Sequence, residues 1–329
     1  MERTLKKYAP HIEKNELSPL FFDDGKQNGL IVDPKKENVP LDFIGFGMLR
    51  LSAEYQTLET MENEMVIVPQ EGIFEMEING SRFRGERLGG PFTVELGRTN
   101  ASALYVPRYS QLKIRGEGEV AFFTAEAYGD KPPFYISSHE VRMVSRGEWL
   151  WRRDVVNLIN PKNASTNLIV GETYNPPGLW SGTPPHTHDK DDSQGGESDH
   201  EEIYYFRFSI AQKGGSNYAP YAVQLLMDGV SLKKAFILED RSIFAIPGGI
   251  HPIVVSPFTE VLYLWGMAGY GNDLLVKDVP EFAHLKNFEE ILRTLDPKKL
   301  KIFCLKNIFY AFLVKKRFPR RKRGFTFLC

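Results

Sequence analysis

Cysteine is nearly absent from this chain of 329 residues, and the two that occur, Cys304 and Cys329, both lie near its end. The long stretch before them can hold no disulfide framework, which fits a reducing compartment. The opening residues up to Pro19 contain no apolar core of the kind that secretory signals carry. We therefore expect a cytoplasmic protein.

Long apolar runs and late acidic residues are missing as well. No stretch approaches the roughly 18 consecutive apolar residues of a spanning helix, so we expect no membrane span. No Asp or Glu follows Asp296, whereas eleven Lys and Arg lie between Lys298 and Arg323. Without this basic tail the chain has 30 basic and 42 acidic residues, a net charge of −12. A body with this charge repels phosphate, so we expect it not to bind nucleic acid.

The chain does contain many short runs rich in β-branched and aromatic residues, separated by 28 Gly and 21 Pro. One run ends in Asn79-Gly80, the strongest short hairpin signal. Such runs form two series, residues 41–137 and 138–280, and this spacing is typical of sandwiches and barrels. The series echo one another, since Tyr105-Val-Pro107 has the same place in the first as Phe244–Pro247 in the second. We predict an all-β protein with two tandem cupin-type β-barrels, a bicupin.

The two flanks of the predicted barrels differ. Residues 1–40 are polar, and we interpret them as a loosely ordered arm with one strand near Leu30-Ile-Val. Region 281–329 begins with a short predicted helix, because apolar residues from Phe282 recur at helical spacing until Pro297 stops them. The basic tail follows. Three interpretations of the tail stay open: contact with an anionic membrane surface, packing on a neighbouring subunit, or an unselected extension.

The seven histidines are unevenly distributed. None lies between Ile12 and Ser138, so we expect no metal site in the first barrel. In the second half, His186 and His188 stand at i and i+2, positions that point the same way only on a β-strand. His251 follows a Pro-Gly-Gly turn. Three imidazoles and a strand carboxylate predict a site for one divalent transition metal, Zn, Mn, Fe, Ni or Co. The alternative is a solvated histidine-rich loop.

Two adjacent glutamates compete for the carboxylate position. Glu201 and Glu202 face opposite sides of one strand, so only one of them points to the metal. Glu202 shares its face with Tyr204, and Glu201 shares its face with Tyr205 and Arg207. Periodicity barely separates the two. The outward glutamate would pair with a cation such as Arg207.

Several motifs resemble the 5-deoxy-glucuronate isomerases of inositol breakdown and the related 4-deoxy-5-hexosulose-uronate ketol-isomerases of pectin breakdown. The matching segments are Val170–Thr173, Pro184–Asp189, Glu201–Arg207, Ile246–Pro252 and Leu262–Gly269. The resemblance implies a bicupin, a divalent metal and an aldose–ketose isomerisation. It implies the metal ligands His186, His188, Glu202 and His251. The implied reaction converts 5-deoxy-D-glucuronate into 5-dehydro-2-deoxy-D-gluconate.

Two catalytic roles are assigned as hypotheses. Glu172 is the predicted base for a proton-transfer route, because a carboxylate in a partly apolar pocket has a raised pKa. Arg207 is the predicted cation for the substrate carboxylate. A hydride shift is the other route, and the sequence does not distinguish the two.

The competing functions are the pectin-branch isomerase and a cupin of another kind, either a metal-dependent dioxygenase or a sugar-acid-binding protein. The expected partners are a small sugar acid and further copies of the same chain, in a homo-oligomer. A coupled assay with both uronates separates the two isomerases, and oxygen consumption would reveal a dioxygenase.

Overall fold

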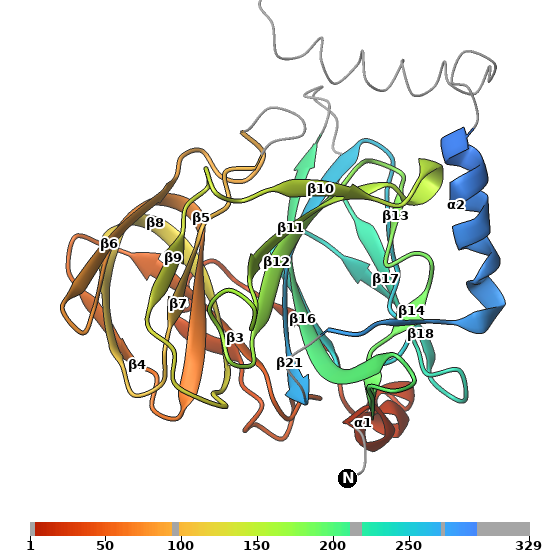
Figure 1. Cartoon of the computed structure of the whole chain (residues 1–329), viewed down its shortest axis with the longest axis horizontal. Coiled ribbons are helices and arrows are strands. Elements are labelled where there is room, and N and C mark those ends of the chain that lie inside the picture. The colour runs from red at the N-terminus through yellow and green to blue at the C-terminus, as the bar shows by residue number, and fades with distance from the viewer. Residues whose placement is uncertain (1–3, 94–98, 211–218, 271–273, 295–329) are drawn as a thin grey trace, which may run out of the picture. The chain divides into compact units, whose positions relative to one another are not determined.

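The computed structural model describes residues 4–93, 99–210, 219–270 and 274–294 (Figure 1). The basic tail predicted at 298–329 lies outside these residues. The chain divides into two compact units, residues 1–285 and 286–329, and every described strand belongs to the first.

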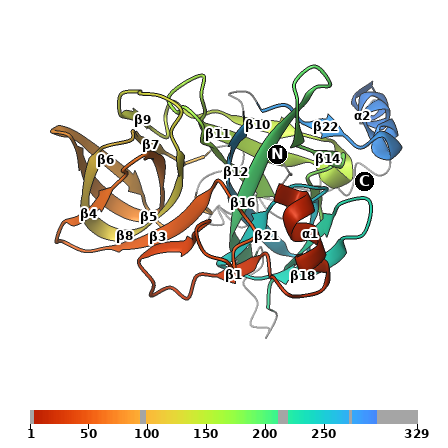
Figure 2. The same cartoon turned by 90° about the horizontal axis from the view of Figure 1, so that it is seen from below.

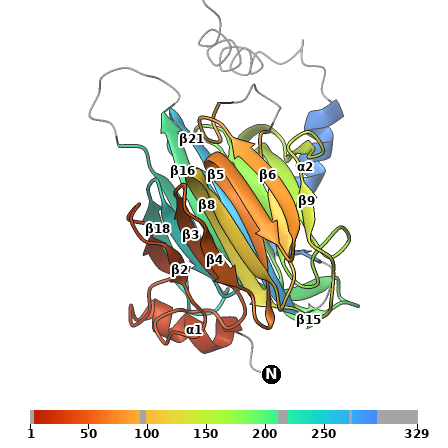
Figure 3. The same cartoon turned by 90° about the vertical axis from the view of Figure 1, so that its left-hand side faces the viewer.

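The first series of strands forms one sheet (Figure 3). In the described residues it has eight strands, in the order β2-β3-β8-β5-β7-β9, with β4 beside β8 and β6 beside β5. Its strands are β2 (Gly29–Val32), β3 (Gly45–Leu51), β4 (Gln56–Glu59), β5 (Asn63–Ile78), β6 (Ser81–Arg87), β7 (Ala103–Val106), β8 (Gln111–Glu126) and β9 (Phe134–Ile136). All of the pairings are antiparallel.

Two features of β5 follow from its sequence. The expected strands on either side of Pro69 are one strand, since β5 runs through with a register shift between Pro69 and Glu71. A bulge tolerates proline there, because proline has no N–H to give to the ladder. The predicted hairpin at its end is confirmed: Asn79 and Gly80 have φ of 49° and 85° and join β5 to β6.

The second series forms a larger set of sheets. Within the described ranges one sheet has eight strands, in the order β1-β19-β16-β21-β12-β11-β10 with β15 beside β16. Its strands are β1 (Leu20–Phe22), β10 (Met143–Arg146), β11 (Arg153–Ile159), β12 (Ile169–Asn175), β15 (Asp189–Asp192), β16 (Glu197–Ile210), β19 (Ser242–Ile246) and β21 (Thr259–Tyr270). A second sheet runs β13-β20-β17-β18, and a third pairs β14 with β22. These are β13 (Trp180–Ser181), β14 (His186–Thr187), β17 (Ala222–Met227), β18 (Lys233–Leu238), β20 (Ile253–Val255) and β22 (Lys277–Asp278).

The N-terminal segment is not a loose arm. It contains helix α1 (Thr4–Glu13), and β1 pairs with β19 of the second barrel. Leu5, Tyr8 and Ile12 form a buried stripe that packs into that barrel's interior core. Figure 2 shows α1 near β1 and β18. The prediction missed α1 because the helix is short and contains a proline, so packing rather than propensity stabilises it. The strand expected near Leu30 is confirmed as β2.

Among the described residues, three apolar clusters fill the fold. One fills the first barrel and one fills the second. The third lies between them, where the ring of Phe46 in the first half packs against the ring of Tyr205 in the second, with their centroids 5.2 Å apart. Polar clamps join the halves as well. The buried carboxylate of Glu64 accepts backbone N–H bonds from Thr166, Asn167 and Leu168 at 2.8, 2.8 and 2.6 Å.

The helices at the C-terminal end are short. The predicted helix is confirmed as α2 (His284–Thr294), after the 3-10 turn η2 (Pro280–Phe282). A further 3-10 turn, η1 (Trp149–Trp151), precedes β11. Of the helices in the described ranges, none has the length and apolar character needed to cross a membrane.

Candidate metal centre

Three of the predicted ligands converge inside the second barrel. The ligand atoms of His188, Glu202 and His251 lie within 4.8 Å of one another, and all three side chains are buried. Oε2 of Glu202 is 3.4 Å from Nε2 of His188 and 3.3 Å from Nε2 of His251. Ligands bonded at about 2.1 Å to one tetrahedral metal lie roughly 3.4 Å apart. The spacing is therefore that of a coordination sphere.

Backbone carbonyls fix the tautomer of all three imidazoles. A carbonyl oxygen only accepts, so each Nδ1 must donate its proton. The bonds run from His186 to Pro184 at 3.0 Å, from His188 to His200 at 3.0 Å and from His251 to Gly249 at 2.7 Å. In the neutral ring Nε2 is then left with a lone pair, the state in which an imidazole binds a metal.

The residues present fit a divalent metal. Nε2 of His188 is buried and has no hydrogen-bond partner. A lone pair that faces a carboxylate at this distance repels it unless a cation lies between them. Several nitrogen donors and one oxygen suit Zn, Mn, Fe, Ni or Co.

His186 is the outer member of the group. Its ring centre lies 5.8 Å from that of His251 and 6.4 Å from that of His188. It is partly exposed and opens β14, so the HxH pair does begin on a strand, though a short one. The structure thus places His186 beside the buried triad.

Strand alternation separates the two glutamates. Glu202 of β16 faces the imidazoles, whereas both oxygens of Glu201 accept backbone N–H bonds, from Asp42 and Phe43 at 2.8 Å each. Glu201 therefore binds the segment before β3 instead of the predicted cation, Arg207.

The turn that carries His251 requires glycine. Gly248 and Gly249 have φ of 132° and 85°, and a Cβ on Gly249 would come 2.5 Å from the carbonyl oxygen of Met227. The N–H of Gly249 donates to Asp189 at 2.9 Å, one residue after His188. Leu5 of α1 also lies against the turn, since a Cβ on either glycine would come within 3.2 or 3.3 Å of its side chain. The position of His251 thus depends on two distant segments.

The charges at the centre are set by burial and by the neighbours. For Glu202, burial raises the pKa, but the close imidazoles of His188 and His251 outweigh it and lower the pKa to about 2. For His188, burial lowers the pKa, but the close carboxylate of Glu202 outweighs it and raises the pKa. For His186, burial and then the nearby His251 lower the pKa to about 4. The centre therefore combines one carboxylate with an outer imidazole that stays neutral at physiological pH.

Aromatic side chains line the centre. Tyr204 lies 6.1 Å from the ring of His251 and 4.7 Å from that of Tyr263. Burial, followed by the charge of Glu202, raises the pKa of Tyr204 well above its ordinary value, and burial also raises the pKa of Tyr263. Both hydroxyls stay protonated and can donate to a ligand. The Tyr263 hydroxyl bonds to Ser181 Oγ at 2.5 Å.

The two residues predicted to be catalytic do not join this group. Both oxygens of Glu172 are bound by the guanidinium of Arg87, at 2.6 and 2.9 Å, and both side chains are fully buried. Arg207 donates to Glu119 at 3.0 Å and to Asp240 at 3.1 Å. Both residues lie on the strand face that packs toward the first barrel, and the sequence did not reveal which of the two buried faces holds the metal centre.

Two polar residues beside the centre were not predicted. Ser181 orients the Tyr263 hydroxyl, and Arg153 donates to the carbonyl of Thr183 at 2.8 Å. Neither residue is among the site residues that the sequence predicts. Pairing with distant strands, rather than spacing along the chain, brings them here.

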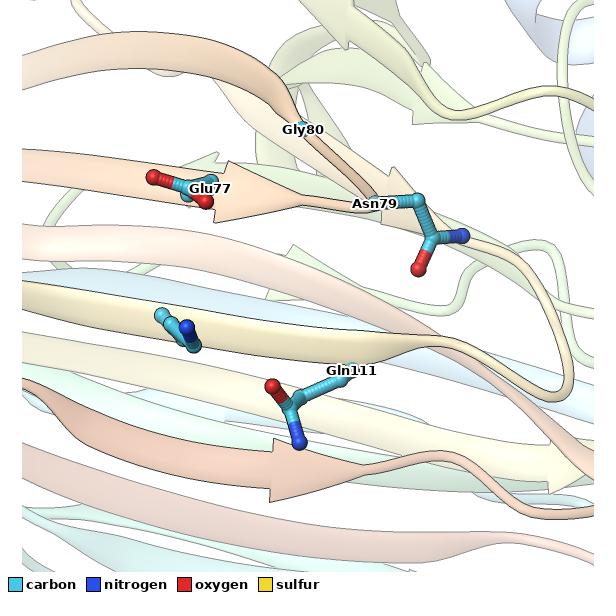
Figure 4. A pocket seen from close by; sticks show the side chains of 5 residues that line it. Glu77, Asn79, Gly80 and Gln111 are labelled. Atoms are coloured by element: carbon cyan, nitrogen blue, oxygen red, sulfur yellow. The ribbon is translucent and has the colours of Figure 1, made fainter.

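A separate hollow on the first barrel has different chemistry (Figure 4). It is lined by Glu77, Asn79, Gly80, Gln111 and Lys113. The side chains come from the β5–β6 hairpin and from β8, and no histidine is among them. It offers no set of metal ligands.

Known proteins are similar in sequence over most of the length of this chain. The 5-deoxy-glucuronate isomerase of Geobacillus kaustophilus is 28% identical over 247 residues, 74% of this chain and 86% of the relative. The 5-deoxy-glucuronate isomerase of Lacticaseibacillus casei is 27% identical over 259 residues, 77% of this chain and 92% of the relative.

Solved structures confirm the predicted bicupin fold. The crystal structure of an IolB-like protein from Salmonella typhimurium superposes with a TM-score of 0.71 at 25% identity, covering 81% of this chain and 98% of that one. The oxalate decarboxylase of Lactobacillus farciminis shares the fold, with a TM-score of 0.52 at 11% identity over 92% of this chain and 96% of that one. The KduI/IolB family model matches residues 19–285. The chain therefore belongs to the KduI/IolB family.

Proposed function

We propose that this protein is a metal-dependent aldose–ketose isomerase that converts 5-deoxy-D-glucuronate into 5-dehydro-2-deoxy-D-gluconate in myo-inositol catabolism. The observation that carries the proposal is the buried triad of His188, Glu202 and His251, whose histidines have their Nδ1 protons held by carbonyls. The shared name of the relatives supports the substrate assignment.

The proposal gives the two barrels different roles. Residues 138–280 would hold the metal and the substrate, and residues 41–137 would hold no metal and support the second barrel. The substrate is a small sugar acid. The homo-oligomer and the cytoplasmic location stay predictions.

In the mechanism, the ligands would be His186, His188, Glu202 and His251. A divalent ion held there would supply a Lewis acid toward the substrate's carbonyl. Tyr204 and Tyr263 keep their protons and would donate hydrogen bonds to substrate oxygens, and Ser181 would orient the Tyr263 hydroxyl. Trp265, held through Nε1 by Thr173 at 3.2 Å, adds an apolar wall that excludes water. Glu172 and Arg207 have no part in this mechanism, because they are paired elsewhere.

Turnover of 5-deoxy-D-glucuronate by purified protein, combined with elemental analysis, tests the proposal. We expect product, with about one Zn, Mn, Fe, Ni or Co per chain. His188→Ala should lose both metal and turnover. His139→Ala is the matched control, because this histidine is exposed. Metal-loaded wild-type protein that leaves the uronate unchanged would refute the proposal.

The transferred hydrogen reports the route. Reaction in D2O introduces deuterium into the product if a base removes a proton, and introduces none if a hydride shifts directly.

A second candidate, the 4-deoxy-5-hexosulose-uronate ketol-isomerase, has the same centre. The family name covers both branches, whereas the relatives cited above carry the name of the first. Parallel assays with both uronates decide between them, and a higher kcat/KM on 5-deoxy-D-glucuronate is expected.

A further inference from the structure

Arg153 lies on the same face of the sheet as the metal centre. It opens β11, and Val155, two residues on, packs against the interior core of the second barrel, whereas Val156 packs between the barrels. Val155 is opposite Thr173 on β12, and Thr173 is opposite Tyr263 on β21. Since alternate residues share a face, Arg153 leaves the sheet on the side of Tyr263.

The guanidinium of Arg153 is only partly used by the protein. Nη1 donates to the carbonyls of Thr183 and Trp151, at 2.8 and 3.3 Å. Within the described part of the chain, its other N–H groups make no hydrogen bond to the protein. An arginine has five N–H donors in a planar fork that matches a carboxylate. One edge of this fork is therefore left for a ligand.

Arg153 also differs in its ion pairs from three other arginines of the fold, each of which is paired with a carboxylate. Arg87 is paired with Glu172, and Arg207 and Arg241 are both paired with Glu119. Among the residues that the structure describes, no ion pair involves Arg153. The side chain is nevertheless half-buried.

The neighbouring strand adds a second positive charge. Arg146 of β10 is directly opposite Arg153 in the register, and it too has no ion pair in the described ranges. Like charges that face each other across strands destabilise a sheet. An anion bound between them would relieve this repulsion.

The charge of Arg153 affects the pKa of side chains at the centre. Burial is the main cause of the raised pKa of Tyr204 and of Tyr263, and the charge of Arg153 opposes it in both. It also contributes to the lowered pKa of His186, after burial and His251. These three side chains border the proposed substrate site.

We propose that Arg153 binds the carboxylate of the sugar acid and so determines the enzyme's specificity for acids over neutral sugars. The inference rests on the proposed function of the same site. The substrate would lie with its carbonyl end at His188, Glu202 and His251 and its acidic end at the free edge of the guanidinium. Arg153 replaces Arg207 in this role, because Arg207 is already neutralised by two internal carboxylates.

Binding of a probe that cannot be isomerised separates this inference from the reaction. D-gluconate has a carboxylate on an open six-carbon chain and no carbonyl to isomerise, and D-glucitol is its neutral counterpart. Calorimetric titration of the metal-loaded protein should show that Arg153→Gln weakens gluconate binding on the order of 30-fold and leaves glucitol binding unchanged. Arg153→Lys should give an intermediate loss, because lysine keeps the charge without the fork. Arg84→Gln, which removes an exposed charge from the first barrel, is the matched control.

The outcomes are distinct. Equal gluconate affinity in the wild type and Arg153→Gln, or no gluconate binding by the wild type, overturns the inference. Equal losses for gluconate and glucitol, or loss of the metal from both Arg153 variants, shows that Arg153 only supports the segment before His186, and this also overturns it. Wild-type protein that binds gluconate through Arg153 but does not convert 5-deoxy-D-glucuronate would refute the proposed function and leave the inference standing.

Discussion

The two barrels place different side chains at one equivalent position. Glu202 of the second barrel pairs with Ile246, the residue before the proline that opens the turn to His251. In the first barrel Met65 pairs with Val106, again the residue before a proline. Met65 is therefore the positional counterpart of Glu202.

The rest of the two interiors differs in the same way. The first barrel is filled by apolar side chains such as Ile67, Phe74, Leu104 and Ile114, and its sequence has no histidine. The second barrel keeps an apolar core but leaves one end to imidazoles, a carboxylate and tyrosine hydroxyls. Under the proposed function, similar backbones would serve stability in one half and chemistry in the other, and a few side chains would make the difference.

Glu202→Met breaks this difference most directly, because it gives the second barrel the side chain of the first. We expect kcat/KM to fall by at least about 10³-fold, because the metal loses its only carboxylate ligand. Turnover measures this loss, elemental analysis reports the metal content of the variant, and Met65→Leu is the control in the other barrel. A Glu202→Met protein with wild-type turnover would contradict the proposed ligand set.

Arg87→Met tests the buried ion pair between Arg87 and Glu172, which joins the two barrels. Leaving the carboxylate of Glu172 buried and unpaired should lower the free energy of unfolding by about 3–5 kcal/mol. Urea unfolding measures the loss, and the double variant Arg87→Met/Glu172→Met should recover most of it. This double variant should also keep its turnover. A stable, metal-loaded double variant without turnover would restore Glu172 as a catalytic base.

Met65→Ala sharpens the comparison from the side of the first barrel. The cavity should lower the free energy of unfolding by about 2–4 kcal/mol. Metal content and kcat/KM should stay at wild-type values, because the proposed function gives this interior no part in the reaction. Loss of metal at a temperature where the variant is folded would show that the barrels are not separate in function.

A fall in pH should weaken metal binding at the centre in the second barrel. The proton and the metal compete for Nε2 of His188, whose pKa is raised above 6.5. Glu202, with a pKa of about 2, and His186, with a pKa of about 4, do not titrate in this range. The metal Kd should therefore rise about tenfold for each unit that the pH falls below the His188 pKa. A Kd that is constant between about pH 5 and 8 would contradict this assignment.

The stability of the metal-free protein should depend on pH in the opposite direction to metal binding near neutral pH. It should fall as the pH rises. The ion pair between His188 and Glu202 in the metal-free protein is fully stabilising below pH 6.5 and is lost as the pH rises through the raised His188 pKa. The contribution of Glu202 is present above pH 4.5 and is lost as the pH falls toward about 2. The contribution of this pair should therefore be largest between pH 4.5 and 6.5, and thermal unfolding of the metal-free protein should show a melting temperature that falls as the pH rises above this range.

The sequence predicted most strands and drew attention to the histidines of the candidate centre, because both depend on local patterns. Alternation and turn residues marked β5, β6 and β7, and the HxH spacing marked His186 and His188. The structure places Glu172 and Arg207, the two residues with hypothetical catalytic roles, in ion pairs away from the buried triad. Both faces of β12 and β16 are buried, so polar alternation does not show which face meets the metal and which meets the other barrel. The sequence assigns Arg153 no role at the centre either, because only the pairing of β11 with β12 and of β12 with β21 brings it to the side of Tyr263.

The glycine turn before His251 links the beginning of the chain to the reaction. Leu5 lies against that turn, so a protein that lacks residues 1–13 would lose this contact and leave the turn to depend on its hydrogen bond to Asp189. We expect such a truncation to weaken metal binding before it lowers the solubility of the protein. A purification tag that displaces α1 would lower the apparent activity without touching any ligand.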